Sequence, residues 1–274
     1  MPAHRNLLRT LQIGLSLLAA LVVVFPVYWM IRTTMGDPLA YPPPFLPTDF
    51  SLQAYVKVFE HPLIWRWMGN TLFVAGGTVA VNLICSSLGA YALARLPFKG
   101  KNLVLLLVLS TQMMSQALLV TPMFRIFSNL GWINTLGVLI LADTALTLPL
   151  STWILVRFFE RVPKELEEAA LIDGSSRMGV YRRIVLPLAS PALVTVAILT
   201  FFDAWNEYIF GYTFTNTAQN WVASVGLSSF MGQFLIEWRS LMIMTSIFIL
   251  LPVAFYVIFE RYIVSGLVEG ALKE

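Results

Sequence analysis

The sequence predicts an all-α membrane protein with six transmembrane helices. Of its 274 residues, 58% are hydrophobic and only 12% are charged, whereas a soluble domain usually carries about 25% charged residues. The mean hydropathy is +0.75. Six apolar stretches each reach the roughly 20 residues that a helix needs to cross a bilayer. This composition excludes a disordered chain and argues strongly against an ordinary soluble enzyme.

The six apolar stretches predict one transmembrane domain over residues 1–274. The predicted spans cover about residues 10–31, 70–94, 102–124, 134–157, 189–211 and 240–260. A charged connection at residues 159–188 separates the fourth span from the fifth. Acidic residues in the interior of the spans are few: Asp143 lies in the fourth, and Asp203 and Glu207 lie in the fifth.

The first apolar stretch has a competing interpretation as a signal peptide, because His4, Arg5 and Arg9 precede it. Its uncharged run is longer than the 7–15 residues of a typical signal-peptide core, and it contains Pro26 and Trp29. No convincing small-residue cleavage site follows. We therefore expect a retained anchor helix.

The basic residues predict the orientation of the chain. If the N-terminus is cytoplasmic, 13 of the 18 Lys and Arg residues fall on the cytoplasmic side and five on the outer side. This asymmetry follows the rule that basic residues concentrate in cytoplasmic loops, and it places both termini in the cytoplasm. The net charge of +3 is too small and too dispersed to indicate a nucleic-acid partner.

The sequence lacks the residues needed for a disulfide, for a histidine metal site and for ATP hydrolysis. Cys85 is the only cysteine, so an intrachain disulfide is impossible, and His4 and His61 are the only histidines and lie outside the predicted spans. The chain has no G-x-x-x-x-G-K-[ST] phosphate loop. We therefore expect no ATP hydrolysis, no metal site and no bound cofactor. A proline-rich outer segment at residues 41–47 predicts a stiff extended spacer, or a contact for an external partner.

The 159–188 connection predicts two short helices joined by a turn. Pro163 suits the start of a helix, and acidic residues follow it where the helix dipole favours them. Gly174 can end this helix in the left-handed conformation, and Ser175 or Ser176 can cap the next one. An interfacial helix lying on lipid is the alternative, but the first helix is acidic and lacks the Lys-rich face of such helices. A protein-docking element is the better interpretation.

Three parts of this connection resemble a known family. Glu168-Ala169-Ala170, then Asp173-Gly174, then Ile184-x-Leu186-Pro187 resembles the EAA loop of permease subunits of ATP-binding-cassette importers. Other segments resemble the carbohydrate branch, the maltose-type second permease. They are Gly89-Ala90-Tyr91-Ala92-Leu93-Ala94-Arg95, Gly131-x-x-Asn134-Thr135, Ala204-Trp205-Asn206-Glu207 and the tail Gly266-Leu267-x-x-Gly270-Ala271-x-Lys273. Ser175 and the terminal Glu274 depart slightly from the family pattern.

The resemblance implies a type I importer permease fold in a bacterial or archaeal inner membrane. It implies that the EAA loop forms a coupling helix in a groove of a partner ATPase dimer, which holds ATP and Mg. The coupling residues would be Glu168, Ala169, Ala170, Asp173 and Gly174. Further implied partners are a second homologous permease, an external solute-binding protein and membrane lipid. The C-terminal tail would approach the ATPase interface, or would simply be a frayed end.

The acids inside the spans are functional candidates, because charge in a membrane is costly. Asp203 and Glu207 are four residues apart, so we expect them on one face of the fifth helix, beside Trp205 and Asn206. They either line a sugar path or form a gate or subunit-contact network, and we favour the second role. Asp143 is a weaker candidate for lining the path.

The predicted function is the permease subunit of an ATP-driven, binding-protein-dependent importer of a sugar, oligosaccharide or related polyol. A stand-alone channel or secondary carrier for a small polar solute is the alternative. It is disfavoured because no Asn-Pro-Ala pair and no clear inverted repeat are present. A membrane enzyme would have to rely on Asp203 and Glu207 as its carboxylate pair.

Overall fold

The computed structural model describes residues 2–35, 45–46, 53–97, 99–231 and 238–271, with side chains throughout except at 2–8, 10, 54 and 260–271. The chain divides into two compact units. One comprises Met1–Pro62 and Leu227–Leu250, and the other comprises Leu63–Gly226 and Leu251–Glu274. Most of the proline-rich outer segment and the last three residues lie outside the described residues, so the predictions made for them remain predictions.

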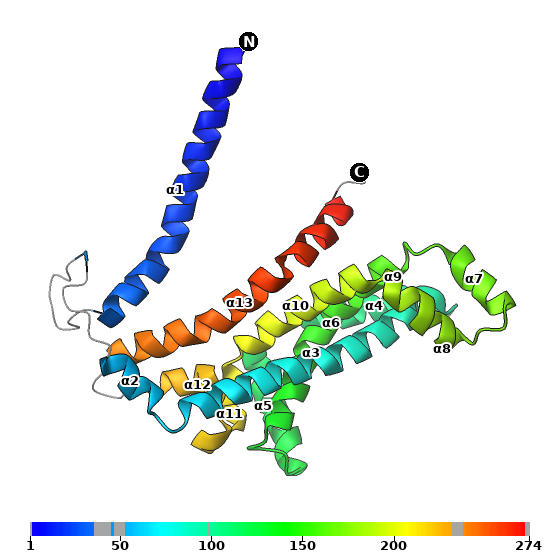
Figure 1. The fold of residues 1–274 in the computed structure, drawn as a ribbon. Helices are drawn as coiled ribbons and strands as arrows, with labels where there is room; N and C mark the ends of the chain where they lie inside the picture. Colours follow the sequence, from blue (N-terminus) through cyan, green and yellow to red (C-terminus); the bar gives the residue numbers. More distant parts are fainter. Residues whose placement is uncertain (1, 36–44, 47–52, 98, 232–237, 272–274) are drawn as a thin grey trace. The chain divides into compact units, whose positions relative to one another are not determined.

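The first unit contains α1 (Pro2–Met35), α2 (Gln53–Phe59) and the beginning of α13 (Trp238–Ala271) (Figure 1). The described apolar side chains of α1 are mostly exposed, as expected for a helix that lipid surrounds. Near its C-terminal end, the hydroxyl of Thr34 hydrogen-bonds the hydroxyl of Tyr55 on α2. This hydrogen bond joins α2 to α1.

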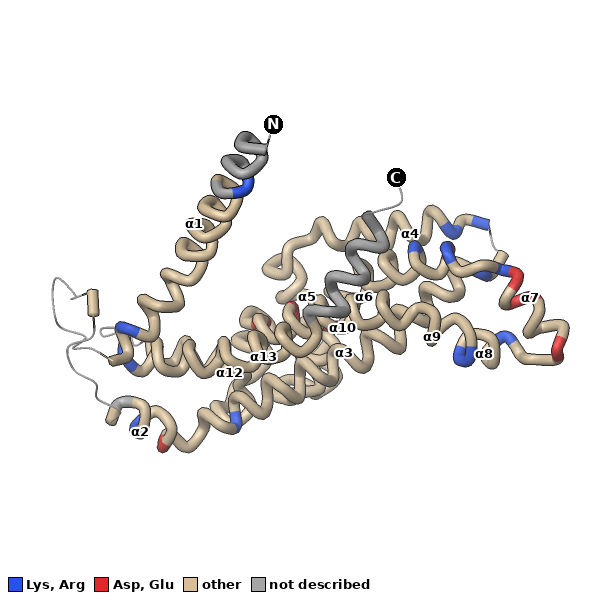
Figure 2. The backbone as a smooth tube through the Cα atoms, turned by 45° about the horizontal axis from the view of Figure 1, so that its top comes forward, with Lys and Arg blue, Asp and Glu red and all other residues tan. Residues whose placement is uncertain are grey.

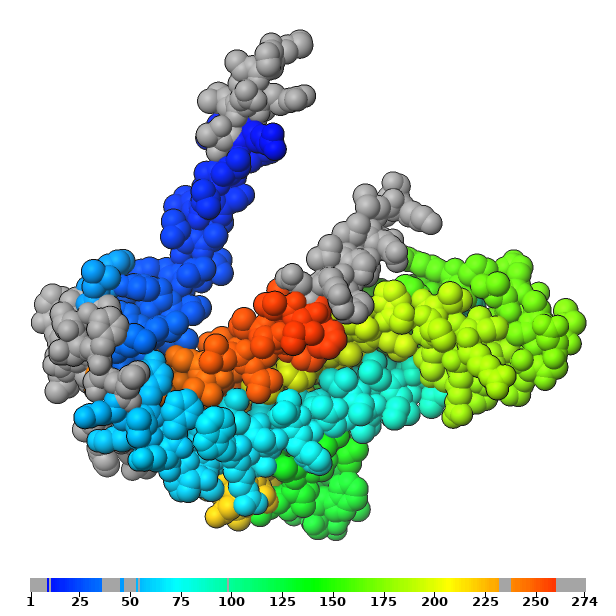
Figure 3. All heavy atoms as spheres, viewed as in Figure 1, coloured from blue at the N-terminus to red at the C-terminus, as the bar shows by residue number. Residues whose placement is uncertain are grey.

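The second unit is built around three long helices. These are α3 (Ile64–Arg95), α6 (Leu136–Phe159) and α10 (Ser190–Trp205), which pack against one another in every pairing. Figure 3 shows α10 lying along α3. The other elements are α4 (Lys101–Ser110), η1 (Thr111–Met113), α5 (Gln116–Asn129), α7 (Lys164–Ile172), α8 (Arg177–Val180), η2 (Tyr181–Val185), α9 (Leu186–Leu188), α11 (Ile209–Phe214), η3 (Ala218–Asn220) and α12 (Ala223–Ser228).

Apolar clusters fill the two ends of the three-helix core, and polar side chains lie between them. Leu155, Phe159 and Val185 belong to the cluster at the α7–α8 end. In the middle, the buried amide of Asn82 on α3 donates to Thr147 on α6 at 2.6 Å and to Thr200 on α10 at 3.2 Å. Hydrogen bonds of this kind hold membrane helices together. Apolar side chains contribute less, because they gain little by exchanging contact with lipid for contact with another helix.

Among the described residues, four helices are long and apolar enough to cross a membrane. The number is six if each of two bent helix pairs is one span. The two bends differ from the straight helices that the sequence predicts. The third span is split into α4–η1 and α5 at an angle of 102°, and the approach to the fifth span bends by 77° before α10. The first bend comes where Gln112, Ser115 and Gln116 interrupt the apolar run.

The end of the second unit opposite α7 and α8 is tied together through Asn134. This residue has a positive φ of 66°, and its side-chain oxygen accepts hydrogen bonds from the backbone of Asn216 at 2.9 Å and Thr217 at 3.1 Å. The next residue, Thr135, caps α6 by accepting from the backbone of Val138 at 3.4 Å. The Gly131-x-x-Asn134-Thr135 motif therefore organises the loop that begins α6.

Candidate functional site

The 159–188 connection forms two short helices joined by a turn, as the sequence predicts. Gly174, at φ +86°, ends α7, and its N–H donates to the carbonyl of Leu171 at 3.1 Å. Ser176 caps α8 by accepting from the backbone N–H of Gly179 at 3.2 Å. Pro163, expected as the first helical residue, is instead the N-cap of α7, which begins at Lys164.

Much of the surface of α7 and α8 is exposed and apolar. Ile172 is 86% exposed, and Leu166 and Met178 are each nearly half exposed. Among the apolar residues Leu166, Ala169 and Ala170 of α7, only Ala170 packs on the core of its own unit, while Leu166 and Ala169 are exposed. Glu168, Asp173 and Gly174 are exposed beside them. The two helices thus present an apolar surface with acidic side chains next to it.

Basic residues gather at the same end of the second unit (Figure 2). Arg95 lies at the C-terminal end of α3, Lys101 begins α4, and Arg157 lies in the last turn of α6. Lys101 and Arg157 both contact the carboxylate of Glu160, at 3.7 Å and 3.3 Å. Several of the basic residues that set the predicted orientation therefore lie at the same end of the second unit as α7 and α8.

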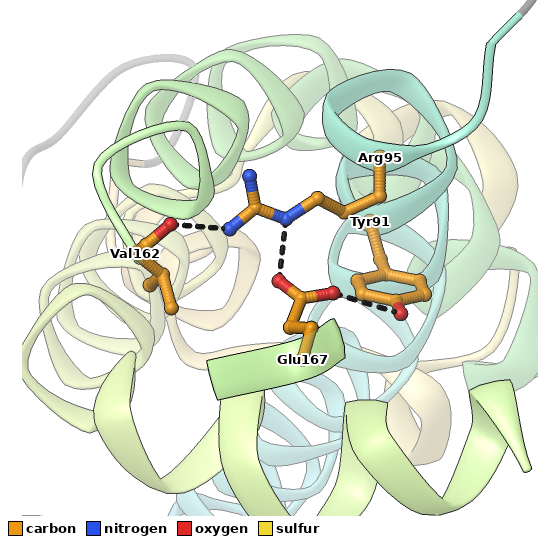
Figure 4. Close-up of polar contacts among 4 residues, drawn as sticks. All are labelled: Tyr91, Arg95, Val162 and Glu167. Atoms are coloured by element: carbon orange, nitrogen blue, oxygen red, sulfur yellow. Dashed lines mark hydrogen bonds and ion pairs between the residues drawn. The ribbon is translucent and has the colours of Figure 1, made fainter. Parts of the chain in front are cut away.

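Glu167 ties α7 to α3 (Figure 4). Its carboxylate accepts a hydrogen bond from Nε of Arg95 at 2.5 Å and one from the hydroxyl of Tyr91 at 3.3 Å. Arg95 also donates through Nη2 to the carbonyl of Val162, just before α7, at 2.6 Å. The ion pair is shielded, since the Arg95 and Glu167 side chains are 6% and 10% exposed. We call Tyr91, Arg95, Val162 and Glu167 the α3–α7 clamp.

Sequence reasoning selected Glu168 and missed Glu167. Adjacent residues on a helix point about 100° apart, so one glutamate of the pair must face away from the surface that the other presents. Tyr91 and Arg95 were recognised only as part of a family-like segment. The sequence gives no signal that pairs Glu167 with Arg95, because the two residues are 72 positions apart.

A cavity of about 260 Å³ lies among the membrane helices of the second unit. Four of the five predicted path or gate residues line it: Asp143, Asp203, Asn206 and Glu207. Its remaining lining residues are Gln112, Met114, Gln116, Leu146, Thr147 and Ala204. The fifth predicted residue, Trp205, is not in the lining. It is 1% exposed and stacks on Phe201 with ring centroids 5.5 Å apart.

The prediction that Asp203 and Glu207 share one helical face is wrong, because α10 ends at Trp205 and Asn206 is its C-cap. Glu207 turns away from α10 to cap α11. Its carboxylate accepts from the backbone N–H groups of Phe210 at 2.7 Å and Gly211 at 2.8 Å. Free N–H groups at a helix start favour a negative charge, which explains the break.

Glu207 also links three elements around the cavity. Its carboxylate accepts from the side-chain amide of Gln116, at the start of α5, at 2.6 Å. Its backbone carbonyl accepts from the hydroxyl of Ser224 on α12. This network lies within one chain, so the favoured role as a gate or subunit contact remains a prediction. Gln116 was missed because a single amide in an apolar run gives little signal by itself.

Asp143 has a different environment from Glu207. It is 3% exposed, and among the described residues its Oδ2 atom has no hydrogen-bond partner. Asp203 and Asn206 are exposed at the open side of the cavity. The arrangement can therefore accept hydrogen bonds from a ligand that carries donors.

Comparisons with known proteins agree on one family. The profile described as "Binding-protein-dependent transport system inner membrane component" matches residues 83–268. The chain is 38% identical to the trehalose/maltose transport system permease protein MalG of Thermococcus litoralis, with 97% of each chain covered. It is 32% identical to the diacetylchitobiose uptake system permease protein DasC of Streptomyces coelicolor, with 92% of each covered.

A solved structure shares the fold. It belongs to a bacterial ABC transporter involved in the import of the acidic polysaccharide alginate, and it matches with a TM-score of 0.82 at 20% identity. The match covers 94% of this chain and 96% of the other. Together with the family match, this likeness confirms the fold of an importer permease, with four to six candidate membrane helices among the described residues.

Proposed function

The chain belongs to the family of inner membrane components of binding-protein-dependent transport systems, and from this we propose that it is the permease subunit of an ATP-driven carbohydrate importer. The cargo class is a sugar, an oligosaccharide or a related polyol. Support comes from the relatives, whose printed names refer to trehalose, maltose and diacetylchitobiose. Their similarity extends over more than nine-tenths of the chain.

The partners in this proposal are an ATPase dimer, a second homologous permease and an external solute-binding protein. ATP and Mg are held by the ATPase, and this chain contributes no catalytic group. The α7–α8 end is cytoplasmic, because Arg95, Lys101 and Arg157 lie at this end and cytoplasmic loops favour basic residues. Both termini lie on that same side of the membrane.

Coupling in this proposal runs through α7. Its exposed surface, with Glu168, Ala169, Asp173 and Gly174, docks into a groove on the ATPase. The α3–α7 clamp then carries any displacement of α7 to the C-terminal end of α3. Because α3 packs along α6 and α10, a shift of its end changes the packing of the whole three-helix core.

The observation that carries the proposal is the combination of an exposed docking surface and a buried ion pair on one short helix. A helix of nine residues has little stability of its own, so it needs such an attachment to act as a rigid connector. Exposed Ile172 and buried Glu167 show that α7 has one outward and one inward side.

Reconstitution tests the proposal directly. Proteoliposomes would contain this chain, its second permease and its ATPase, with the binding protein outside and ATP and Mg inside. Uptake of labelled sugar should require every component and should stop when ATP is omitted. Uptake by this chain alone, without ATP, would instead establish the stand-alone channel or carrier.

A further inference from the structure

Both helix breaks around the cavity supply residues to its lining. Met114 comes from the break between η1 and α5, and the lining residues Gln112 in η1 and Gln116 in α5 lie on either side of it. Asn206 and Glu207 come from the break between α10 and α11. Irregular backbone at membrane depth is tolerated only where protein buries it or where it lines a water-filled cavity. Broken helices of this kind are where transporters commonly place ligand sites.

The depth of the cavity follows from the helices that line it. Asp143 is seven residues from Leu136, where α6 begins, which corresponds to about 10 Å along the helix axis. Asp203 is three residues from Asn206, where α10 ends. These acids therefore lie within the helical part of the unit. Contact of an exposed polar side chain such as Asp203 with lipid would carry a large free-energy cost there.

The lining is rich in acceptors and lacks positive charge. Its ten described residues include three carboxylates, three side-chain amides and one hydroxyl, and none of the ten is Lys, Arg or His. Glu207 is already engaged by two backbone N–H groups and an amide. Among the described residues nothing bonds the buried Oδ2 atom of Asp143, and a buried polar atom without a partner is costly.

We propose that this cavity is a hydrated binding site for an uncharged, hydroxyl-rich segment of a saccharide, and that it disfavours anionic sugars. The proposal deepens the proposed importer function and rests on it. Sugar hydroxyls donate to Asp143 and Asp203 and exchange hydrogen bonds with Gln112 and Asn206. A carboxylate or phosphate on the ligand would instead meet three acids without a neutralising cation.

The size of the cavity limits what it holds. At about 260 Å³ it is below the roughly 300–1,000 Å³ of a site that encloses a whole drug-sized ligand. It therefore holds one part of an oligosaccharide at a time. Such partial binding is expected of a site through which a solute moves during transport. Asp203 and Asn206, at the open side, meet that part first.

Cysteine labelling of the assembled complex tests the hydration and the charge preference. Cys85 is the only cysteine, so Cys85→Ser gives a cysteine-free background. Asn206→Cys in this background is treated with a cationic or an anionic methanethiosulfonate reagent. Each rate is divided by that of the same reagent with 2-mercaptoethanol. Phe73→Cys, an apolar position on α3 that is 61% exposed, is the matched control.

The expected result is charge-selective labelling of Asn206→Cys, with the cationic reagent favoured by about tenfold or more. Adding Asp143→Asn and Asp203→Asn should reduce this preference severalfold. Phe73→Cys should react with neither reagent. An unreactive Asn206→Cys would mean that lipid or the second permease fills the cavity. Equal normalised rates would remove the charge preference, and either result would overturn the proposal.

Protection from labelling tests the ligand class. Trehalose, maltose and diacetylchitobiose are compared with glucuronate at one concentration. At least one neutral sugar should slow the labelling of Asn206→Cys, and glucuronate should not. Protection by none of the neutral sugars, or equal protection by glucuronate, overturns the proposal. Charge-selective labelling of Asn206→Cys, together with no ATP-dependent uptake by the Cys85→Ser complex that keeps Asn206, would contradict the importer function instead, so the two failures are distinguishable.

Discussion

The Glu167 carboxylate on α7 lies 2.5 Å from Nε of Arg95, the last residue of α3. The two residues are 72 positions apart in the sequence, and both side chains are almost fully shielded. Removing one partner of a buried ion pair typically costs about 3–5 kcal/mol, because the other charge stays buried. This contact is therefore where the attachment of α7 to the membrane helices is most vulnerable.

Glu167→Gln should uncouple the transporter while leaving the ATPase bound. The neutral amide cannot balance the Arg95 charge, so α7 should loosen from α3. We expect uptake per ATP hydrolysed to fall threefold or more, which corresponds to about 0.7 kcal/mol or more of lost coupling. Glu165→Gln, at an exposed position on the same helix, is the control. An unchanged ratio of uptake to hydrolysis in Glu167→Gln would remove the clamp from the coupling path.

The turn between α7 and α8 gives a second prediction. Gly174→Pro forces φ to about −65°, whereas the turn needs φ +86°, and it removes the N–H that donates to Leu171. We expect uptake to be lost while the membrane helices still insert. Gly174→Asn should keep most of the activity, because Asn tolerates the left-handed region. Normal uptake by the proline variant in an assembled complex would show that the turn is dispensable.

Glu168 provides the third prediction. It is exposed on α7, next to the apolar docking surface. Glu168→Lys should weaken binding of the ATPase by about tenfold or more, because the reversed charge would meet a basic groove. Glu60→Lys makes the same change in charge at an exposed position on the predicted outer side. Binding is measured with the purified ATPase on nanodisc-embedded permease, and equal affinity for both variants would place Glu168 outside the interface.

The fourth prediction concerns stability. Glu207→Gln retains one acceptor but loses the charge that caps α11, and a hydrogen bond to a charged group is worth about 1.5–3 kcal/mol. The thermal midpoint of the detergent-solubilised complex should fall by about 4–10 °C. Asp203→Asn, on the exposed side of the same cavity, should shift it by less than about 2 °C. Similar shifts for both variants would contradict a structural role for Glu207.

The sequence predicted the membrane class, the local form of α7 and α8, and six spans, a number that the described residues reach only if each bent helix pair is one span. Those features depend on short-range chemistry: apolar length, a glycine at a helix end and a serine at the next helix start. Gly174 and Ser176 adopt the expected roles for that reason. Asn134 was recognised as part of a family-like motif, but its bonds to residues 82 and 83 positions away were not foreseeable.

The features that were missed depend on contacts between distant segments. Glu167 could be distinguished from Glu168 only by knowing which side of α7 faces Arg95. The end of α10 at Trp205 was missed because it depends on the bonds that the Glu207 carboxylate makes with the backbone at the start of α11. The cavity arises where two breaks meet, and neither break is evident from hydropathy alone.

Site-specific photo-crosslinking tests the central claim, that α7 and α8 dock on the ATPase. A photoreactive amino acid is placed at Ile172 on α7, which is 86% exposed, in the reconstituted complex. The control position is Tyr212 on α11, which is 64% exposed at the other end of the second unit. The account predicts a crosslinked product containing this chain and the ATPase from Ile172 and none from Tyr212. Crosslinking to the ATPase from Tyr212, or its absence from Ile172, would contradict the account.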